Sequence, residues 1–303
     1  MDKTNLSMST TKQKNKLPII IDTDLGDDID DIFAITLALA SDKFDVRLIT
    51  VCSNDIEYKL KVAKLLTARL GYDIPLAKGV QINRSNTPHD VSGVELGEYP
   101  DAVDAIANEV EAGTRVIVGL GPATNLAAFV KKYSHLRDKC SIVYMGASIR
   151  YGYIHQDEPC AEFNVVCDAK AFIELSESGF DLIIAPLDVC RDYIIDGEYF
   201  AKIRSAGNKF AATYIDFYDE WHAKYFGGAL KYPQETSSGI MYDAIPFLYL
   251  LDQSLYKVED LLIRCDNDGN TRIDPKGYPM RVMTNVPDKK RVVEVATKIL
   301  CGD

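Results

Sequence analysis

The residues best suited to chemistry are six aspartates within ten positions near the start of the chain. They directly follow an apolar run that ends at Ile21, and they are Asp22, Asp24, Asp27, Asp28, Asp30 and Asp31. Like charges packed this closely repel each other unless water or a cation neutralises them. A hard divalent ion such as calcium takes about six to eight oxygen ligands and would meet that need. The spacing therefore favours a cation site.

Two other interpretations of this acidic segment are weaker. Carboxylates at the start of a helix cap it and favour the positive end of its dipole, but capping needs one or two of them and not six. The nucleophile loop of haloacid-dehalogenase-type phosphatases also has the pattern Asp-x-Asp. That loop needs Thr or Val two positions after the second aspartate, where this chain has Gly26.

The elements that must position these side chains follow from alternating hydrophobic patterns. Strand-length apolar runs occur at 17–23, 46–51, 115–120, 141–145 and 182–186, and helical patterns at about 56–70, 101–112, 124–133 and 168–178. The acidic segment itself leads into an amphipathic helix whose apolar face holds Ile32, Ile35 and Leu39. This alternation predicts right-handed βαβ units in a single-domain α/β fold, with a mostly parallel, Rossmann-like sheet flanked by helices.

Polar residues follow several of the predicted strands. The first strand ends in Asp22 and Asp24, the second is followed by Asn54, the third by the turn 121–125, and a later one by Asp188. Ligands in parallel sheets bind beyond the carboxyl ends of the strands. We therefore expect the functional site at this edge of the sheet.

The last third of the chain has a different pattern. Longer helices follow residue 195, and the segment 214–232 is rich in aromatic residues. The segment 256–286 contains turn signals that are typical of a hairpin or edge strands. The final helix, about 289–300, is expected to pack back on the body.

Bulk properties restrict the class of protein. The chain has 303 residues, 47% of them hydrophobic and 26% charged, and a formal net charge of -11, which disfavours nucleic acid as a partner. No apolar run approaches the roughly 20 residues that cross a bilayer, so no membrane partner is expected. Residues 1–16 are polar and predict a disordered tail, with one catalytic domain from 17 to 303. Seven cysteines without a CxxC pair favour reduced thiols in the cytoplasm.

Five segments, taken in order, resemble the nucleoside hydrolases, the inosine-uridine preferring N-ribohydrolases. The acidic segment is similar to their signature DTDPGxDDAxAI, and the other similarities are His89 to Gly93 with HGxxG, Gly121 to Asn125 with GPLTN, Glu162 to Asn164 with EFN, and Tyr242 to Ala244 with HDA. Each short piece is weak alone, but their order across most of the chain is specific.

The resemblance implies a calcium site and a catalytic base. Asp24 would bind calcium and take a proton from a metal-bound water. Asp31 and Asp243 would be further ligands, and Thr124 would contribute its backbone carbonyl. Ribose binding is implied for another set, in which Asp30, Asn54 and Asn164 hold the hydroxyls and Glu162 and Gln156 reach the 5′ side.

The chain departs from the family pattern at two places. Leu25 replaces proline, and the acidic loop is two residues longer if the following helix is aligned, which equates Asp30 and Asp31 with the family pair. Counting forward from Asp24 instead puts Asp28 at the ribose-contacting position, so both alternatives stay open.

The second departure is Tyr242, which stands where many members have a histidine beside the leaving base. A phenol donates a proton less readily than imidazole at neutral pH. His89 is a candidate to assist the leaving base from its own loop. His222 or Tyr225 could substitute from the aromatic segment, where Trp221 could stack on a base, although aromatic residues at helical spacing are more often core.

The resemblance as a whole predicts calcium-dependent hydrolysis of ribonucleosides to a free base and ribose, as in nucleoside catabolism and purine salvage. One alternative is a ribohydrolase for a modified nucleoside or another ribosyl conjugate. Another is a calcium-dependent nucleoside or ribose binding protein without turnover. The resemblance further implies a homodimer or homotetramer.

Overall fold

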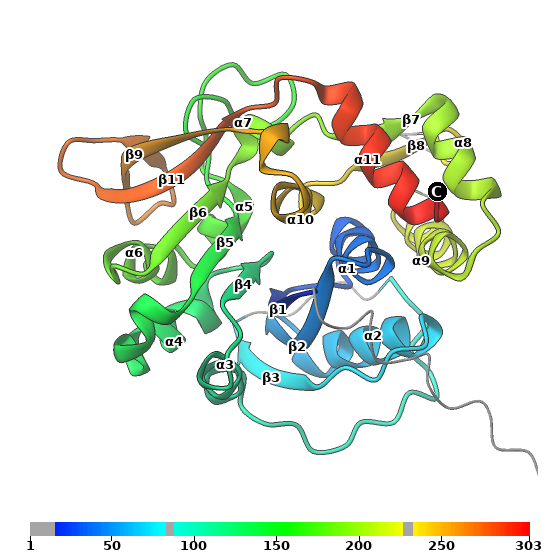
Figure 1. Ribbon diagram of the computed structural model, residues 1–303, viewed down its shortest axis with the longest axis horizontal. Coiled ribbons are helices and arrows are strands. Elements are labelled where there is room, and N and C mark those ends of the chain that lie inside the picture. Colours follow the sequence, from blue (N-terminus) through cyan, green and yellow to red (C-terminus); the bar gives the residue numbers. More distant parts are fainter. Residues whose placement is uncertain (1–15, 83–87, 227–232) are drawn as a thin grey trace, which may run out of the picture.

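A nine-stranded sheet forms the centre of the protein, in the order β10-β9-β11-β6-β5-β4-β1-β2-β3 (Figure 1). The computed structural model describes residues 16–82, 88–226 and 233–303. The strands of this sheet are β1 (Leu17–Thr23), β2 (Phe44–Ser53), β3 (Leu76–Gln81), β4 (Val116–Gly119), β5 (Ser141–Met145), β6 (Asp181–Ala185), β9 (Lys257–Cys265), β10 (Thr271–Ile273) and β11 (Tyr278–Asn285). Neighbours from β3 to β11 pair in parallel, whereas β9 and β10 pair antiparallel at one edge.

Helices cover both faces of the sheet. They are α1 (Asp30–Ala40), α2 (Ile56–Arg69), α3 (Ala102–Glu111), α4 (Thr124–Lys132), α5 (Phe163–Cys167), α6 (Ala169–Glu177), α7 (Leu187–Cys190), α8 (Gly197–Ser205), α9 (Lys209–Phe226), α10 (Ala244–Leu251) and α11 (Lys289–Cys301), with 3-10 turns at Ser134–Lys139 and Gln253–Leu255. A small two-stranded sheet, β7 (Ile194–Asp196) and β8 (Ser237–Ile240), lies among the carboxyl-terminal helices.

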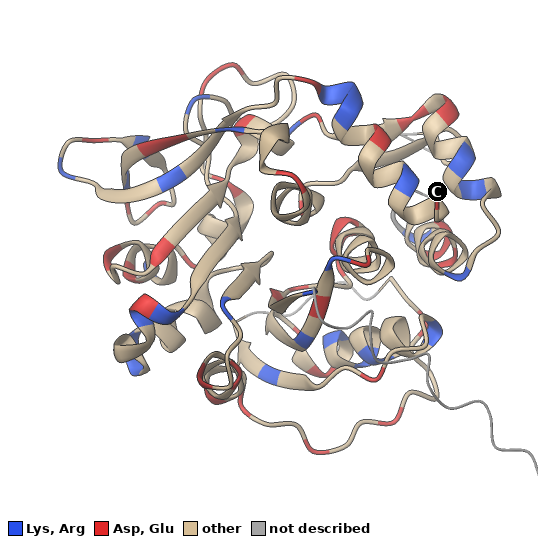
Figure 2. Cartoon of the chain, viewed as in Figure 1, with Lys and Arg blue, Asp and Glu red and all other residues tan. Residues whose placement is uncertain are grey.

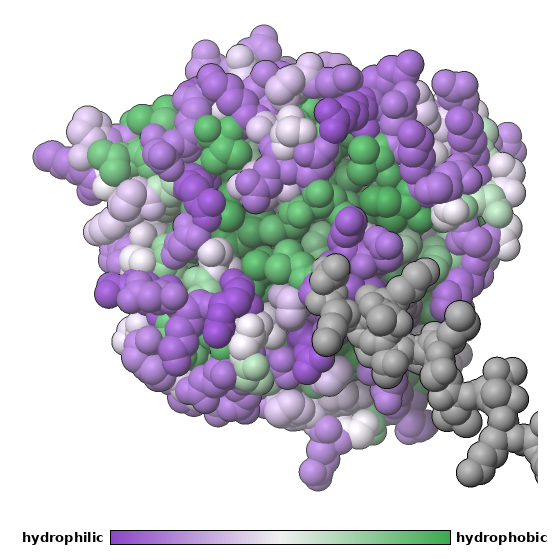
Figure 3. Space-filling model, viewed as in Figure 1, coloured by the Kyte–Doolittle hydropathy of each residue, from purple (hydrophilic) through white to green (hydrophobic). Residues whose placement is uncertain are grey.

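Two apolar clusters form the core, one on each face of the sheet. Side chains of β1 alternate between them: Ile19 and Ile21 pack with α1, α2 and the carboxyl-terminal helices, while Ile20 packs with α3, α4 and α6. This alternation follows from the period of two residues in a strand. Polar residues cover most of the face seen in Figure 3, which is hollowed at its centre where apolar residues gather.

The predicted fold class is confirmed, including the strands at 17–23 and 141–145 and the edge strands within 256–286. The short strand β3 was not predicted. The prediction that α1 is amphipathic was wrong, because every residue from Asp30 to Leu39 is buried. The helix packs against the sheet on one side and against α9, α10 and α11 on the other.

Three further predictions concern the chain as a whole. Of the polar segment 1–16, only Lys16 lies within the described residues, so the predicted tail falls outside them. No helix in the described ranges has the length and apolar character needed to cross a bilayer. All seven cysteines are free thiols.

The sheet order identifies where a ligand would bind. The chain builds β1, β2 and β3 in one direction and then returns to place β4, β5 and β6 on the other side of β1. The two directions diverge between β1 and β4, and a crevice forms at the carboxyl ends of strands at such a point. Asp24 follows β1 and Leu120 follows β4, so both residues border this crevice.

Candidate active site

A cavity of about 580 Å³ lies at the carboxyl ends of the central strands. Fourteen residues line it: Asp24, Asp27, Asp28, Asp30, Asp31, Asn54, Leu120, Met145, Tyr153, Glu162, Phe163, Asn164, Tyr242 and Asp243. Six of them are aspartates, and the others are mostly aromatic or amide side chains. In Figure 2, acidic residues mark the amino end of α1, whereas basic residues lie on outer helices such as α8 and α11.

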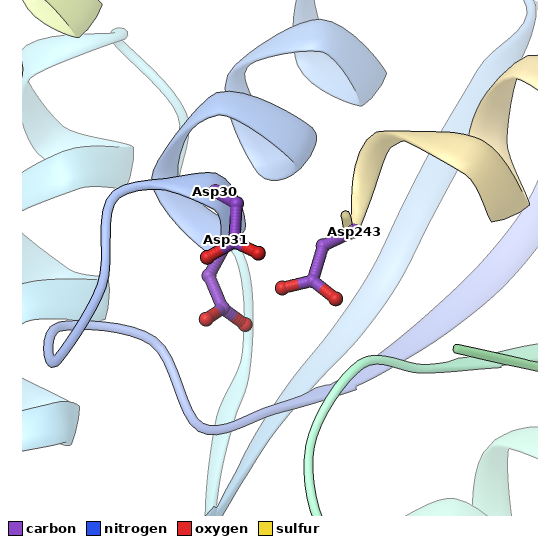
Figure 4. Close-up of side chains that lie close together, drawn as sticks. All are labelled: Asp30, Asp31 and Asp243. Atoms are coloured by element: carbon purple, nitrogen blue, oxygen red, sulfur yellow. The ribbon is translucent and has the colours of Figure 1, made fainter. Parts of the chain in front are cut away.

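Three aspartates in this cavity form a compact group (Figure 4). Asp30 and Asp31 begin α1, and Asp243 immediately precedes α10. One carboxylate oxygen from each lies within 4.8 Å of the others, and all three side chains are buried. The Thr23 hydroxyl donates a hydrogen bond to Asp31 and holds its carboxylate in place. The fold therefore brings acids from both ends of the chain to one point.

Burial strongly disfavours ionisation of this group. It raises the pKa of Asp30, Asp31 and Asp243 well above the usual range, and repulsion among these neighbouring carboxylates raises it further. Such acids need either protons or a cation. An all-oxygen donor set at this spacing fits a hard cation, so Asp30, Asp31 and Asp243 could hold a metal ion.

Asp24 lies at the end of β1 in the same cavity. A side chain at Gly121 would place its Cβ 2.7 Å from Asp24 Oδ1, so a larger residue there would displace the Asp24 carboxylate. Burial raises the pKa of Asp24 to about 6, while the nearby Lys59 opposes that shift. A carboxylate with a pKa near the working pH suits proton transfer.

The acidic loop between Asp24 and α1 contributes two more carboxylates, Asp27 and Asp28. Both line the cavity, as does Asp30, so both alternatives for the ribose-contacting residue are present. Asp30 belongs to the compact group with Asp31, whereas Asp28 Oδ1 accepts from the Ile29 N–H at 2.7 Å.

Amide side chains border the acids. The buried Oδ1 of Asn54 has no hydrogen-bond partner and is available to a ligand. Asn164 donates from Nδ2 to the Leu120 carbonyl at 2.7 Å, which ties α5 to the end of β4. Glu162 accepts from the N–H groups of Ala147, Asn164 and Val165, so its carboxylate caps α5. Burial raises the pKa of Glu162 to about 7.

The other end of the cavity is aromatic. Tyr153 and Tyr242 meet edge to face with ring centroids 6.2 Å apart. The Tyr153 hydroxyl accepts a hydrogen bond from the Phe163 N–H at 2.9 Å, and Phe163 itself is 64% exposed at the rim. Tyr153 was not among the predicted site residues. It stands in the loop before the Glu162 segment, and no sequence pattern distinguishes it from Tyr151 two positions earlier.

Two predicted site residues lie outside the cavity lining. Thr124 turns its hydroxyl to Asp168, to which it donates at 2.7 Å, and Leu120 is the residue after β4 that lines the cavity. Gln156 is exposed, its carbonyl accepts from Arg191, and Tyr153 occupies the cavity wall instead. The turn that contains Thr124 has a structural role, because Asn125 in the same turn donates hydrogen bonds to Asp22 and to the Val51 carbonyl.

The histidines also lie outside the cavity lining. His89 is buried, with its ring 5.0 Å from that of Phe217 and Nδ1 3.4 Å from Glu220, and burial lowers its pKa to about 4. His222 lies buried in α9 against Tyr218 and Trp221. The side chain of Tyr225 lies outside the described residues. The structure thus leaves phenols, and not imidazoles, at the aromatic end.

Comparison with known proteins agrees with this architecture. The model of the inosine-uridine preferring nucleoside hydrolases matches residues 19–299. The pyrimidine-specific ribonucleoside hydrolases RihA of Shigella boydii and Escherichia coli are each 29% identical over 277 residues, which covers 84% of this chain and 85% of theirs.

Solved structures show the same fold. The plant nucleoside hydrolase PpNRh1 superposes with a TM-score of 0.79 at 22% identity, covering 95% of this chain and 99% of that one. A purine-preferring ribonucleoside hydrolase from Gardnerella vaginalis gives a TM-score of 0.75 at 24% identity, covering 94% and 98%. With a family match that spans nearly every described element, the chain belongs to the inosine-uridine preferring nucleoside hydrolases and is an N-glycosyl hydrolase.

Proposed function

We propose that this protein is a calcium-dependent ribonucleoside hydrolase that releases a free base and ribose. The observation that carries the proposal is the meeting of Asp24 with the buried Asp31 and Asp243 in one cavity. These residues come from opposite ends of the chain, and burying them together is unfavourable without a cation. The family match supplies the reaction type, cleavage of an N-glycosidic bond.

Asp31 and Asp243 would bind the metal. The carboxylates of Asp24 and Asp30 line the same cavity and are candidates for further ligands. Leu120 takes the place of Thr124 as the source of a backbone carbonyl, because Leu120 lines the cavity. Calcium, when bound, supplies a template for a water molecule and the ribose hydroxyls and lowers the pKa of that water modestly.

Asp24 is the proposed general base. It accepts a proton from the attacking water as the oxygen bonds to C1′ of the ribose and the bond to the base nitrogen breaks. The ribose becomes oxocarbenium-like in the transition state, and the surrounding carboxylates stabilise that positive charge. Asn54 and Asn164, with Asp28 or Asp30, hold the ribose hydroxyls, and Glu162 lies at the wall of the same cavity.

The aromatic end would receive the base. Tyr153 and Tyr242 present phenols there, and Phe163 offers a ring face at the rim. Burial raises the pKa of the Tyr153 hydroxyl further, so that it stays protonated at neutral pH and can donate a hydrogen bond to the leaving base. Catalysis then depends on hydrogen bonding from phenols in place of proton donation by imidazole.

The test is a ribose-release assay on chelated protein. Purine, pyrimidine and modified ribonucleosides are supplied with and without calcium, and the matching 2′-deoxynucleosides serve as controls. We expect ribose release that requires calcium and is lost with the deoxy sugars. The RihA relatives are pyrimidine-specific and the Gardnerella vaginalis enzyme is purine-preferring, so the panel also establishes which base this chain prefers.

The alternatives give different results in the same assay. Activity limited to a modified nucleoside or another ribosyl conjugate would redefine the substrate. Binding of ribonucleosides in calorimetry with no ribose released under any condition would contradict hydrolysis and support a binding protein without turnover.

The cellular setting is part of the proposal. Seven free cysteines fit a reducing cytoplasm, because disulfides are rare there. A homodimer or homotetramer stays a prediction, which sedimentation analysis of the purified protein would test.

A further inference from the structure

A buried lysine lies directly beneath the acidic loop. The Lys59 side chain, near the start of α2, is 0% exposed, although lysine is almost never fully buried unless it is paired. Its Nζ forms an ion pair with Asp27 at 2.9 Å and donates hydrogen bonds to the carbonyls of Asp24 and Leu25. The single ammonium group of Lys59 therefore contacts the loop at three residues.

The neighbouring residue holds the same loop. Tyr58 donates from its hydroxyl to the Gly26 carbonyl at 3.0 Å, and that hydroxyl accepts from the His89 N–H at 3.0 Å. Gly26 has a φ of +104°, and a Cβ there would lie 3.1 Å from the Tyr58 ring. The first turns of α2 thus form a cradle that contacts every loop residue from Asp24 to Asp27.

The cradle adds polar contacts to a loop that is otherwise held by the buried side chains of Leu25 and Ile29 and by the hydrogen bond from the Leu25 N–H to the Thr23 hydroxyl. The loop carries Asp24 at one end and leads to Asp30 and Asp31 at the other. Carboxylates at this density repel each other, so without a brace the loop would swing its acids toward solvent. Ordering such a segment before ligand binding lowers the cost of binding.

We propose that Lys59 is a positioning residue, which fixes the backbone of the acidic loop so that Asp24 faces the carboxylates of Asp31 and Asp243 before a metal binds. Tyr58 assists by holding Gly26. The expected effect of Lys59 on calcium binding rests on the proposed function. The contacts between Lys59 and the loop are a property of the metal-free protein.

Two effects of Lys59 on calcium act in opposite directions. Its positive charge repels a nearby cation, so a purely electrostatic role predicts tighter calcium binding when the charge is removed. Its hydrogen bonds order the loop, so a positioning role predicts weaker binding when they are removed. The sign of the change distinguishes the two.

The first experiment measures hydrogen exchange in metal-free protein. In Lys59→Met, we expect the amides of 24–29 to exchange at least about tenfold faster than in the unsubstituted protein, while those of β4 and β5 stay protected. Lys61→Met makes the same charge change on the same helix and serves as the matched control. Unchanged exchange in the loop of Lys59→Met would overturn the proposal, and this result is independent of whether the protein hydrolyses nucleosides.

The second experiment titrates calcium into the metal-free variants by calorimetry. We expect the Kd of Lys59→Met to rise about ten- to hundredfold, as when an outer-shell support of a metal site is removed, with little change in Lys61→Met. An equal or tighter Kd in Lys59→Met would overturn the proposal.

Tyr58→Phe keeps the tests decisive if Lys59→Met does not fold. This milder variant removes only the hydroxyl, which donates to the Gly26 carbonyl and accepts from the His89 N–H. We expect faster exchange in the loop and a Kd for calcium raised about fivefold, since the hydrogen bond to the Gly26 carbonyl contributes roughly 1 kcal/mol. If both properties match the unsubstituted protein, the cradle does not position the loop. If the unsubstituted protein binds no calcium, the proposed function fails while the exchange data still judge the bracing role.

Discussion

The two ends of the cavity are built in different ways. The acidic end consists of Asp24, Asp31 and Asp243 on buried framework elements, with exposures of 4% for the latter two. The aromatic end consists of Tyr153, Phe163 and Tyr242, which come from loops and element ends and are partly exposed. Within it, Tyr153 packs edge to face on Tyr242 and accepts a hydrogen bond from the Phe163 N–H.

This difference indicates a division of labour. Every ribonucleoside substrate contains the same ribose, and the proposed metal ion is the same for all of them. The acidic end that would bind both is accordingly held in place by the strand order and by α1. The base is the variable part of the substrate, and it would meet side chains on loops that can change without disturbing the core. If this division is correct, substitutions at the two ends should affect different measured properties, with calcium affinity changing only for those at the acidic end.

The largest effect is expected at Asp24. Asp24→Asn removes the proposed base but keeps a side chain of similar size, and kcat should fall about 10²- to 10⁴-fold, the range of general base catalysis. Ribose release under saturating calcium measures it. If Asp24→Asn kept the full rate, Asp24 would not be the general base. The acidic end of the cavity would then have no chemical role that sets it apart from the aromatic end.

The next effect concerns metal binding. Asp31→Asn or Asp243→Asn takes one carboxylate from the compact group, and we expect the Kd for calcium to rise at least about hundredfold, more than for loss of an outer-shell support. Calorimetry on metal-free protein provides the value. Calcium binding that survives both substitutions would place the ion elsewhere.

A smaller effect is expected at the aromatic end. Tyr242→Phe and Tyr153→Phe each remove one phenol, and kcat should fall about tenfold through loss of a hydrogen bond to the leaving base. Calcium affinity should stay unchanged in both variants. A loss of calcium affinity in either would show that the two ends are not separable.

The smallest effect is on stability. Asp22 and Glu162 have pKa values raised to about 7, and Asp24 to about 6, chiefly by burial. Between about pH 4 and pH 7 the folded state therefore binds more protons than the unfolded state, so the free energy of unfolding falls as pH rises. We expect the Tm of chelated protein to drop by about 3 °C or more from pH 5 to pH 7.5.

Calcium should reverse this fall, because a bound cation offsets the repulsion among the ionised carboxylates. Exposed acids with lowered pKa values contribute little to the change of stability over this pH range. Glu259, for example, has its pKa lowered to about 2 by hydrogen bonds from Arg150, so its stabilising contribution is already present above pH 5. Thermal unfolding of chelated and calcium-loaded protein across this range tests the expectation, and a Tm that rises with pH in chelator would contradict it.

The fold was predictable from the sequence where patterns are local. Strand and helix alternation gave the parallel sheet, and the acids after β1 indicated the correct edge of it. The burial of α1 was not predictable, because its outer side is covered by α9, α10 and α11 from the distant carboxyl-terminal part of the chain.

The motifs predicted several residues that line the cavity, such as Asp24, Asn164 and Asp243, whose roles stay predictions. The site was less predictable where loop geometry decides. Tyr153, and not Gln156, reaches the cavity because the loop before Glu162 turns one ring inward. Lys59 was missed because a lysine within a helical pattern is normally a solvated residue.

The most direct test of the account is a crystal structure of the protein soaked with calcium and ribose. We predict an ion bound by Asp31 and Asp243 at about 2.3 to 2.6 Å from their oxygens, with Asp24 beside it and the ribose hydroxyls toward Asn54 and Asn164. This structure would also show whether Asp28 or Asp30 contacts the sugar. A cavity without an ion at millimolar calcium, or an ion bound away from these aspartates, would contradict the central claim.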